Sequence, residues 1–273
     1  MKNFRNNLII ISAVLSVLPL FMLLTSVNIK LLRSSSKSAF EKISKTKIDT
    51  SFGVDNITLP IFTFHYVEIV KNKTDFIRKS LSITPLSFEN DLRRLKSEGY
   101  TFYFVKDIPG IFNGSIKLGN KSIVFTFDDG YEDFYTDVFP IIKKYNVKVT
   151  IYVVYNFIGK PNYMNKAQIQ EVINSGLVEL GSHSMNHLNL ISILPQRYSH
   201  EIQTSKKELQ KLFGTTVYTF AYPYGFYNSQ LINEVKNSGY TAAVGTSESK
   251  LQSRDTLFNL GRFKSGGFEH IIR

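Results

Sequence analysis

Two adjacent carboxylates, Asp128 and Asp129, are the residues of this sequence whose type and position most clearly suggest chemistry. They directly follow the apolar, β-rich run 123–127, and Gly130 then permits a tight turn. Acids at the end of a buried strand are costly unless a cation, a proton or hydrogen bonds compensate them. The alternative is an Asx turn in which one acid caps the next helix, and the pair alone leaves both interpretations open.

Two histidines offer a second set of candidate ligands. His183 and His187 are separated by three residues, so a helical turn would place both imidazoles on one face. Two imidazoles with one carboxylate are a familiar ligand set for a catalytic divalent metal, with positions left open for water and substrate. A histidine pair by itself is often only polar surface. Together with the two acids and with the Tyr-Pro-Tyr-Gly turn at 222–225, it indicates one shared site.

The segments around these residues predict how they meet. From residue 59 onward, strand-like apolar runs alternate with amphipathic helical patterns. We expect strands at 59–67, 101–105, 122–127, 148–154, 177–180, 216–221 and 240–245, and helices at 86–98, 133–145, 165–174, 199–213 and 228–237. This alternation favours an α/β fold with a parallel sheet, and it suits a barrel better than an open sheet. The polar clusters all follow strands, at the end where α/β barrels assemble their active sites.

The composition narrows the class of protein. The chain has 273 residues, no cysteine and a formal net charge of +11. The absence of cysteine excludes disulfides, thiolate metal sites and cysteine nucleophiles. The positive charge is compatible with anionic polymers or an anionic membrane surface. Because the lysines are scattered and no basic helix is present, nucleic-acid binding is not expected, and no protein partner is indicated.

The combined motifs resemble those of the polysaccharide deacetylases, the family with the NodB-homology domain, also called carbohydrate esterase family four. Thr-Phe-Asp-Asp-Gly at 126–130, His-Ser-Met-Asn-His at 183–187 and Tyr-Pro-Tyr-Gly at 222–225 are similar to its first three motifs in order and spacing. The resemblance covers roughly residues 58–264. It implies a distorted (β/α) barrel of about seven parallel strands, and a divalent metal, usually Zn²⁺, held by Asp129, His183 and His187.

The resemblance also implies roles for other residues. Asp128 would act as the base that takes a proton from a metal-activated water. The backbone N–H of Tyr224, in the turn formed with Tyr222 and Pro223, would help to hold the oxyanion. The implied substrate is an acetylated polysaccharide.

The sequence departs from the common family pattern in two places. The arginine that usually opens the third motif is replaced by Ala221, and Arg262 is the candidate to supply the missing guanidinium and brace Asp128. The usual late Leu-x-His motif is not visible. Members that act on poly-N-acetylglucosamine lack the same arginine and use an early histidine as general acid, which makes His65 the candidate here. The alternative for His65 is a buried imidazole bonded to a backbone carbonyl.

The implied activity is hydrolysis of N-acetyl groups on N-acetylglucosamine units of a cell-surface or biofilm polysaccharide, with poly-β-1,6-N-acetylglucosamine favoured. The subgroup match is imperfect, because its metal histidines are often separated by four residues and those of this chain by three. A peptidoglycan N-acetylglucosamine deacetylase and a non-catalytic carbohydrate-binding module on the same fold are the alternatives. Retention of both acids and both histidines argues against the binding module, since a pure binder needs no base beside its metal.

The N-terminus predicts attachment to a membrane. Residues 8–27 carry no charge, and as a helix they would span about 30 Å, the thickness of a bilayer core. A cleaved signal peptide is the alternative, but the apolar run is longer than a usual signal core and no clear cleavage site follows it. We therefore expect a single transmembrane helix within residues 1–28, a linker at 29–57, and an extracellular catalytic domain at 58–273.

Overall fold

A parallel sheet forms the centre of the computed structural model, which describes residues 53–72 and 74–265. Eight strands belong to this sheet. Its main path runs through β10 (Ala242–Val244), β9 (Thr219–Ala221), β8 (Val178–Ser182), β7 (Val149–Val153), β6 (Ser122–Phe127), β2 (Ile61–Phe64) and β12 (Phe263–Lys264). The remaining strand, β5 (Thr101–Tyr103), pairs with the first half of β6.

The sheet curls until its two ends approach each other near Leu260. Val244 at the end of β10 forms an isolated parallel bridge with Leu260, just ahead of β12. The Gly245 N–H donates to the Leu260 carbonyl at 2.9 Å. The expected α/β fold with about seven parallel strands is therefore confirmed as a curled sheet. Among the described residues, its edges meet at this bridge rather than along a full strand pair.

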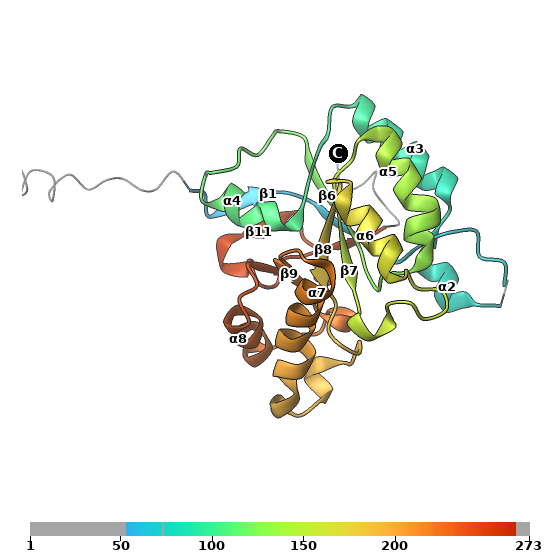
Figure 1. The fold of residues 1–273 in the computed structure, drawn as a ribbon. Helices are drawn as coiled ribbons and strands as arrows, with labels where there is room; N and C mark the ends of the chain where they lie inside the picture. Colours follow the sequence, from blue (N-terminus) through green and yellow to red (C-terminus); the bar gives the residue numbers. More distant parts are fainter. Residues whose placement is uncertain (1–52, 73, 266–273) are drawn as a thin grey trace, which may run out of the picture. The chain divides into compact units, whose positions relative to one another are not determined.

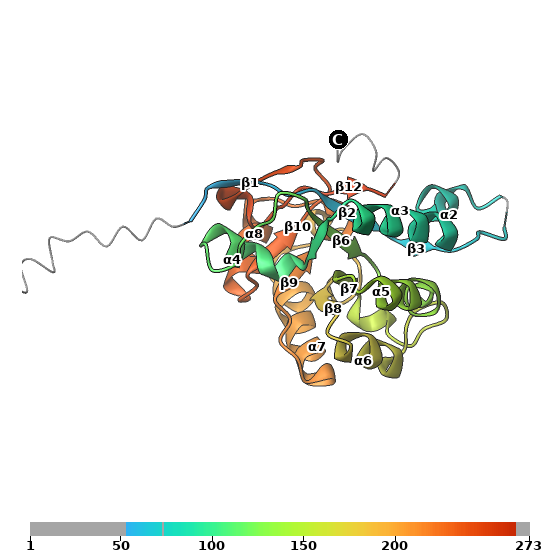
Figure 2. The same cartoon turned by 90° about the horizontal axis from the view of Figure 1, so that it is seen from above.

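Five longer helices lie around the outer side of the sheet (Figures 1 and 2). They are α3 (Pro85–Ser97), α5 (Phe139–Tyr145), α6 (Lys166–Asn174), α7 (Ser205–Phe213) and α8 (Ser229–Asn237). Polar side chains start three of them: Thr84, Asn165 and Asn228 each accept a hydrogen bond from a backbone N–H of the first turn. These three helices lie where the apolar spacing predicted them, within one residue at each end.

Two predicted helices begin differently from the expectation. The segment predicted as a helix at 133–145 opens with a wide π-type turn, Phe134–Val138, and becomes α-helical only at α5, where Pro140 lies in the first turn. The segment 199–213 likewise opens with a π-type turn at His200–Thr204. Such turns place one more residue in the ring of the hydrogen bond than an α-helix does, and they are frequent next to functional sites.

Several short elements were not predicted. The expected strand 59–67 is interrupted at His65, which separates β2 from β3 (Tyr66–Val67); β3 pairs with β4 (Ser82–Ile83) across α2 (Phe76–Ser80). A small helix, α4 (Ile108–Phe112), follows β5. β1 (Asn56–Thr58) starts within the stretch interpreted as a linker and pairs antiparallel with β11 (Leu251–Ser253).

The alternation of side chains along β6 separates the two faces of the sheet. Ile123, Phe125 and Phe127 belong to the apolar cluster that includes Phe88 of α3. Val124 belongs to a second cluster on the opposite face, where Thr126 also lies. All six residues of β6 are buried, so the strand carries the following acids to a fixed position.

No helix in the described ranges is long and apolar enough to cross a membrane. The transmembrane helix predicted within residues 8–27 lies outside the described residues.

Candidate active site

The side chains expected to do chemistry meet where neighbouring strands end. Asp128 and Asp129 follow β6, His183 follows β8, Tyr222 follows β9 and His65 follows β2. All of them line one open cleft of about 710 Å³. Because these strands are parallel neighbours in the sheet, residues far apart in the sequence arrive at the same edge.

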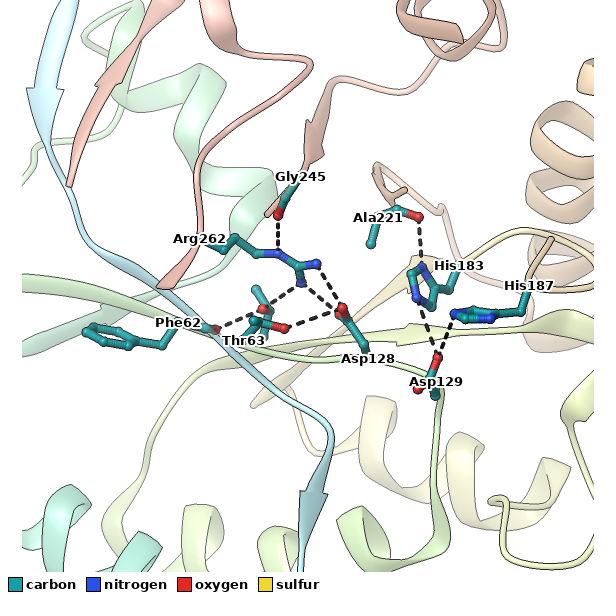
Figure 3. A network of polar contacts seen from close by, with 10 residues as sticks. Phe62, Thr63, Asp128, Asp129, His183, His187, Ala221, Gly245 and Arg262 are labelled. Carbon is teal, nitrogen blue, oxygen red and sulfur yellow. Dashed lines mark hydrogen bonds and ion pairs between the residues drawn. The ribbon is translucent and has the colours of Figure 1, made fainter. Parts of the chain in front are cut away.

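Asp129, His183 and His187 form a compact set of donor atoms, all within 4.8 Å of one another. Figure 3 shows both imidazoles turned toward Asp129, whose Oδ1 lies 3.2 Å from Nε2 of His187 and 3.5 Å from Nε2 of His183. This Oδ1 is buried and accepts no hydrogen bond from the described chain. A buried carboxylate oxygen without a donor, facing two imidazole nitrogens, fits a divalent cation with open coordination positions.

Burial keeps both imidazoles in the neutral form that can bind a metal. Nδ1–H of His183 donates to the carbonyl of Ala221 at 2.8 Å, which fixes the tautomer and leaves Nε2 as the free ligand atom. Burial lowers the pKa of His183 to about 3, and it lowers the pKa of His187 as well. Both rings are therefore neutral near pH 7, the form that binds a metal.

The loop that joins the two histidines is not the helical turn on which the spacing argument depended, and that expectation was wrong. Ser184 and His187 have left-handed backbone angles, with φ of 71° and 56°. The His187 N–H donates to Ser184 Oγ at 2.9 Å, and the buried Glu201 accepts from both nitrogens of Asn186. Hydrogen bonds to the side chains of Ser184 and Glu201 therefore fix the conformation of the loop. The two imidazole rings lie close together although the loop is not helical.

Asp128 forms a buried ion pair with Arg262. Nη1 of Arg262 donates to Oδ1 of Asp128 at 2.7 Å, and Nη2 donates to Oδ2 at 2.8 Å (Figure 3). The same guanidinium donates to Thr126 Oγ1 at 3.0 Å and to the carbonyl of Gly245 at 2.8 Å. Burial alone would raise the pKa of Asp128, but Arg262 and then His183 outweigh it and hold that pKa well below its usual range.

The structure therefore places Arg262 where the resemblance required a guanidinium. The family's usual arginine position is Ala221, whose side chain is buried. Arg262 reaches the same carboxylate from the segment just before β12, which Leu260 ties to β10.

His65 and the Tyr-Pro-Tyr-Gly turn complete the cleft. The half-buried His65 imidazole lines the same cleft as the two acids. Tyr222 is buried, and its hydroxyl donates to the Phe258 carbonyl at 3.0 Å. Pro223 is also buried. Tyr224 has a left-handed φ of 60°, and its ring centroid lies 4.7 Å from that of His187.

Three stacked tyrosines beside Asp129 were missed from the sequence. The ring of Tyr131 lies between those of Tyr66 and Tyr163, with centroid distances of 4.0 and 5.0 Å. Arg78 covers the Tyr66 ring at 4.2 Å and pairs with Glu68. Tyr131 directly follows the Asp-Asp-Gly turn, so its proximity was predictable. Nothing in the sequence signalled that the loop carrying Tyr163 would fold back onto it.

Comparisons with known proteins agree with this geometry. The family model described as polysaccharide deacetylase matches residues 115–243. The Bacillus subtilis protein YxkH, whose name assigns it to the polysaccharide deacetylases, is 30% identical over 217 residues, covering 78% of this chain and 74% of YxkH. The poly-β-1,6-N-acetyl-D-glucosamine N-deacetylase of Staphylococcus aureus strain MSSA476 is 25% identical over 210 residues, covering 71% of this chain and 72% of that enzyme.

Solved structures show the same fold. The Streptococcus pyogenes deacetylase PplD, determined in complex with acetate, superimposes with a TM-score of 0.71 at 26% identity. The match covers 78% of this chain and 92% of PplD.

Proposed function

The chain belongs to the polysaccharide deacetylase family, and from that premise we propose that it is a metal-dependent hydrolase of N-acetyl groups on a cell-surface or biofilm polysaccharide. The observation that carries the proposal is the pairing of two acids in one cleft. Asp129 faces two neutral imidazoles, while its neighbour Asp128 is held in the ionised state by Arg262. Metal-dependent hydrolases combine a cation site with a separate, oriented general base in this way.

Asp129, His183 and His187 would hold the cation. A bound divalent ion, Zn²⁺ being the usual choice for such donors, supplies Lewis acidity toward the amide carbonyl and toward water. Asp128 accepts the proton of the attacking water. Because its pKa is low, Asp128 is ionised and ready at any working pH, and it holds the accepted proton only weakly.

Tyr224 acts as water adds to the carbonyl carbon, and His65 acts as the C–N bond breaks. The C–N bond of the acetamide breaks after water adds to the carbonyl carbon, and the products are acetate and a free amine. An amine is a poor leaving group, so His65 donates a proton to the nitrogen as the bond breaks. The backbone N–H of Tyr224, with Tyr222 and Pro223 shaping the turn, donates to the oxygen that gains negative charge.

We propose poly-β-1,6-N-acetylglucosamine as the substrate. The support is the similarity to the named Staphylococcus aureus enzyme over most of both chains, together with an ionised Asp128 braced by Arg262 instead of the usual arginine. We also keep the proposal that residues 8–27 anchor the chain in the cell membrane with the catalytic domain outside.

A panel of defined glycans tests the function. Amine release is measured with zinc-loaded protein on β-1,6-linked N-acetylglucosamine oligomers, on β-1,4-linked oligomers and on peptidoglycan fragments. We expect the β-1,6 oligomers to be turned over fastest, and an Asp128→Asn variant to lose the activity while it retains zinc. Preference for peptidoglycan fragments would reassign the substrate. Binding without amine release from any glycan would identify a carbohydrate-binding module instead.

A further inference from the structure

Arg262 lies just before the point at which β12 begins to pair with β2. Its side chain is 2% exposed, and its guanidinium lies between the Gly245 carbonyl and the Asp128 carboxylate (Figure 3). The pairing of β12 with β2 starts at Phe263. The position of the guanidinium therefore depends on what fixes the backbone just before Arg262.

Strand pairing fixes the chain two residues before Arg262. The Leu260 N–H donates to the Ala243 carbonyl at 2.9 Å, and the Leu260 carbonyl accepts from the Gly245 N–H at 2.9 Å. Gly261 lies between this pairing with β10 and the pairing of β12 with β2. It is therefore the residue at which the backbone leading to Arg262 has to be held.

The side-chain amide of Gln252 holds Gly261 at both of its backbone groups. Oε1 of Gln252 accepts from the Gly261 N–H at 3.1 Å, and Nε2 donates to the Gly261 carbonyl at 3.0 Å. The same Nε2 donates to the Ser249 carbonyl at 2.9 Å and to the Leu59 carbonyl at 3.3 Å. Gln252 is 1% exposed, so water does not compete for these partners. Because one N–H and three carbonyls surround the amide, its orientation is fixed.

Gly261 is also packed closely from the side of the loop before β11. A side chain at this position would collide with the carbonyl of Ser247 and would crowd Ser249. Only glycine lets the backbone lie so close to that loop. Gln252 and this loop therefore confine Gly261 and fix the point from which the Arg262 side chain extends.

We propose, on the basis of the role of Asp128 in the proposed function, that Gln252 is a positioning residue for Arg262. Its amide fixes Gly261, and through the backbone it keeps both Nη atoms of Arg262 on the two oxygens of Asp128, at 2.7 and 2.8 Å. A bidentate pair of this kind depends on geometry, so a small backbone shift would break one of its two bonds. Gln252 acts through Arg262 and does not contact the reacting atoms in this role.

Gln252→Leu tests the role in catalysis, because it removes the amide and keeps a side chain of similar size. With zinc-loaded protein and a β-1,6-linked N-acetylglucosamine oligomer, we expect kcat to fall about 10- to 100-fold, because misplacing a reacting group by about 1 Å can cost about 10²-fold. KM and zinc content should stay within about twofold of the wild type, since the substrate and metal contacts are unchanged. Gln252→Met also removes the amide and fills the space with a flexible side chain, so it replaces Gln252→Leu if that variant does not fold.

An NMR signal of Arg262 tests its position without substrate or metal. In the wild type the Nε–H is buried and donates to the Gly245 carbonyl at 2.8 Å, so its signal should exchange slowly with solvent. Arg262→Lys identifies the signal, because it removes that N–H. In Gln252→Leu we expect the chemical shift to move and the exchange to be at least about tenfold faster, since the segment that carries Arg262 is no longer held.

Gln210→Leu is the matched control. Oε1 of Gln210 also accepts from a backbone N–H, that of Val217 at 3.1 Å, but this contact precedes β9, at the end of the sheet away from the cleft. The same substitution therefore removes an amide that holds a loop without leading to Arg262. Its kcat should stay within about twofold of the wild type, and the Arg262 signal should not move.

A double substitution separates positioning from a general effect on the fold. In an Arg262→Met background, Gln252→Leu should reduce kcat by less than about twofold, because the guanidinium that it positions is gone. An equal loss in that background would overturn the inference and leave the proposed function intact. Wild-type turnover or an unchanged Arg262 signal in Gln252→Leu would do the same. If the zinc-loaded wild type releases no amine from any glycan, the proposed function is wrong, and the Arg262 signal alone then decides whether Gln252 positions the guanidinium.

Discussion

Two buried carboxylates of the same sheet, Asp129 and Glu179, show how differently a fold can use a buried acid. Glu179 lies on β8, and its Oε2 accepts from the Lys106 N–H at 3.1 Å and from Thr150 at 2.7 Å, while its Oε1 accepts from Thr219 at 2.8 Å. Oδ1 of Asp129 accepts no hydrogen bond from the described residues and faces imidazole nitrogens instead. Burial raises the pKa of both acids, to about 6 for Asp129.

The difference teaches that burial and a shifted pKa do not by themselves mark a functional acid. What separates the two is whether the carboxylate oxygens are satisfied by the protein. A cavity of about 280 Å³ lies beside Glu179, but both oxygens of that residue are already held by donors of the chain. Glu179 therefore ties strands together, whereas Asp129 is left free for a ligand.

The largest effect is expected when Asp129 is replaced by alanine. The cation site then loses its only negative ligand, so zinc should be lost during dialysis and amine release should fall to the background of the assay. Elemental analysis of the purified variant measures the first effect. A full complement of zinc in Asp129→Ala would show that Asp129 is not a metal ligand, and the proposed difference from Glu179 would be wrong.

His65→Ala should have the next largest effect. Loss of the proposed general acid should reduce turnover on the order of 10² to 10⁴-fold, the usual share of acid–base catalysis. Zinc content should stay at the wild-type level because His65 is not a ligand, and the decline of activity on the alkaline side of the pH profile should disappear. A substrate with a better leaving group should recover part of the loss. Near-normal turnover in the zinc-loaded variant would remove His65 from the mechanism.

Glu179→Gln should lower the stability of the fold without changing catalysis. In the variant, the NH₂ group of the amide faces a donor whose hydrogen bond the carboxylate oxygen accepted, and that hydrogen bond is lost. The free energy of unfolding should therefore fall by about 1 to 3 kcal/mol. Urea denaturation measures this change. Turnover and zinc content should remain within about twofold of the wild type, and a loss of zinc would show that the two acids are not separate in function.

Asp133 is a third buried acid, and its effect on the stability of the fold should be small and pH-dependent. It accepts a hydrogen bond from the Val67 N–H in the segment after His65, and burial raises its pKa to about 6 from 3.8. The folded chain therefore binds more protons than the unfolded chain between about pH 4 and 6, so this group lowers stability as the pH rises through that window.

Asp133→Asn removes this titration and keeps an acceptor for Val67. The difference in free energy of unfolding between variant and wild type should shift in favour of the variant by on the order of 1 to 2 kcal/mol from pH 4 to pH 7. Denaturation curves at both pH values give that difference. A constant difference across the window would show that Asp133 titrates normally.

The sequence predicted those parts of the fold that have long, uniform patterns. β6 was placed to the residue, because Ile123, Val124, Phe125 and Phe127 give an apolar, β-rich run that ends at the two acids. The capped helices were placed nearly as well. Strands such as β11 and β12 and the five-residue helices were missed, since two to five residues are too few to show a period and tertiary pairing decides their conformation.

The candidate site was predicted where its residues directly follow strands, as Asp128, Asp129 and His183 do. The contact between Arg262 and Asp128 was suggested only by the missing arginine at Ala221, because no local pattern marks a residue that arrives from the closing end of the sheet. The non-helical loop before His187 was missed because it depends on acceptors from Ser184 and Glu201. Tyr163 reaches Tyr131 through loop pairing that sequence spacing does not encode.

A zinc titration of the chelator-treated protein tests the central claim most directly. Amine release from a β-1,6-linked N-acetylglucosamine oligomer is recorded while Zn²⁺ is added back, for the wild type and for a His183→Ala, His187→Ala double variant. The account predicts activity that rises to saturation at one ion per chain in the wild type and no recovery in the double variant. Full activity in protein verified to be metal-free, or equal recovery in the double variant, would contradict it.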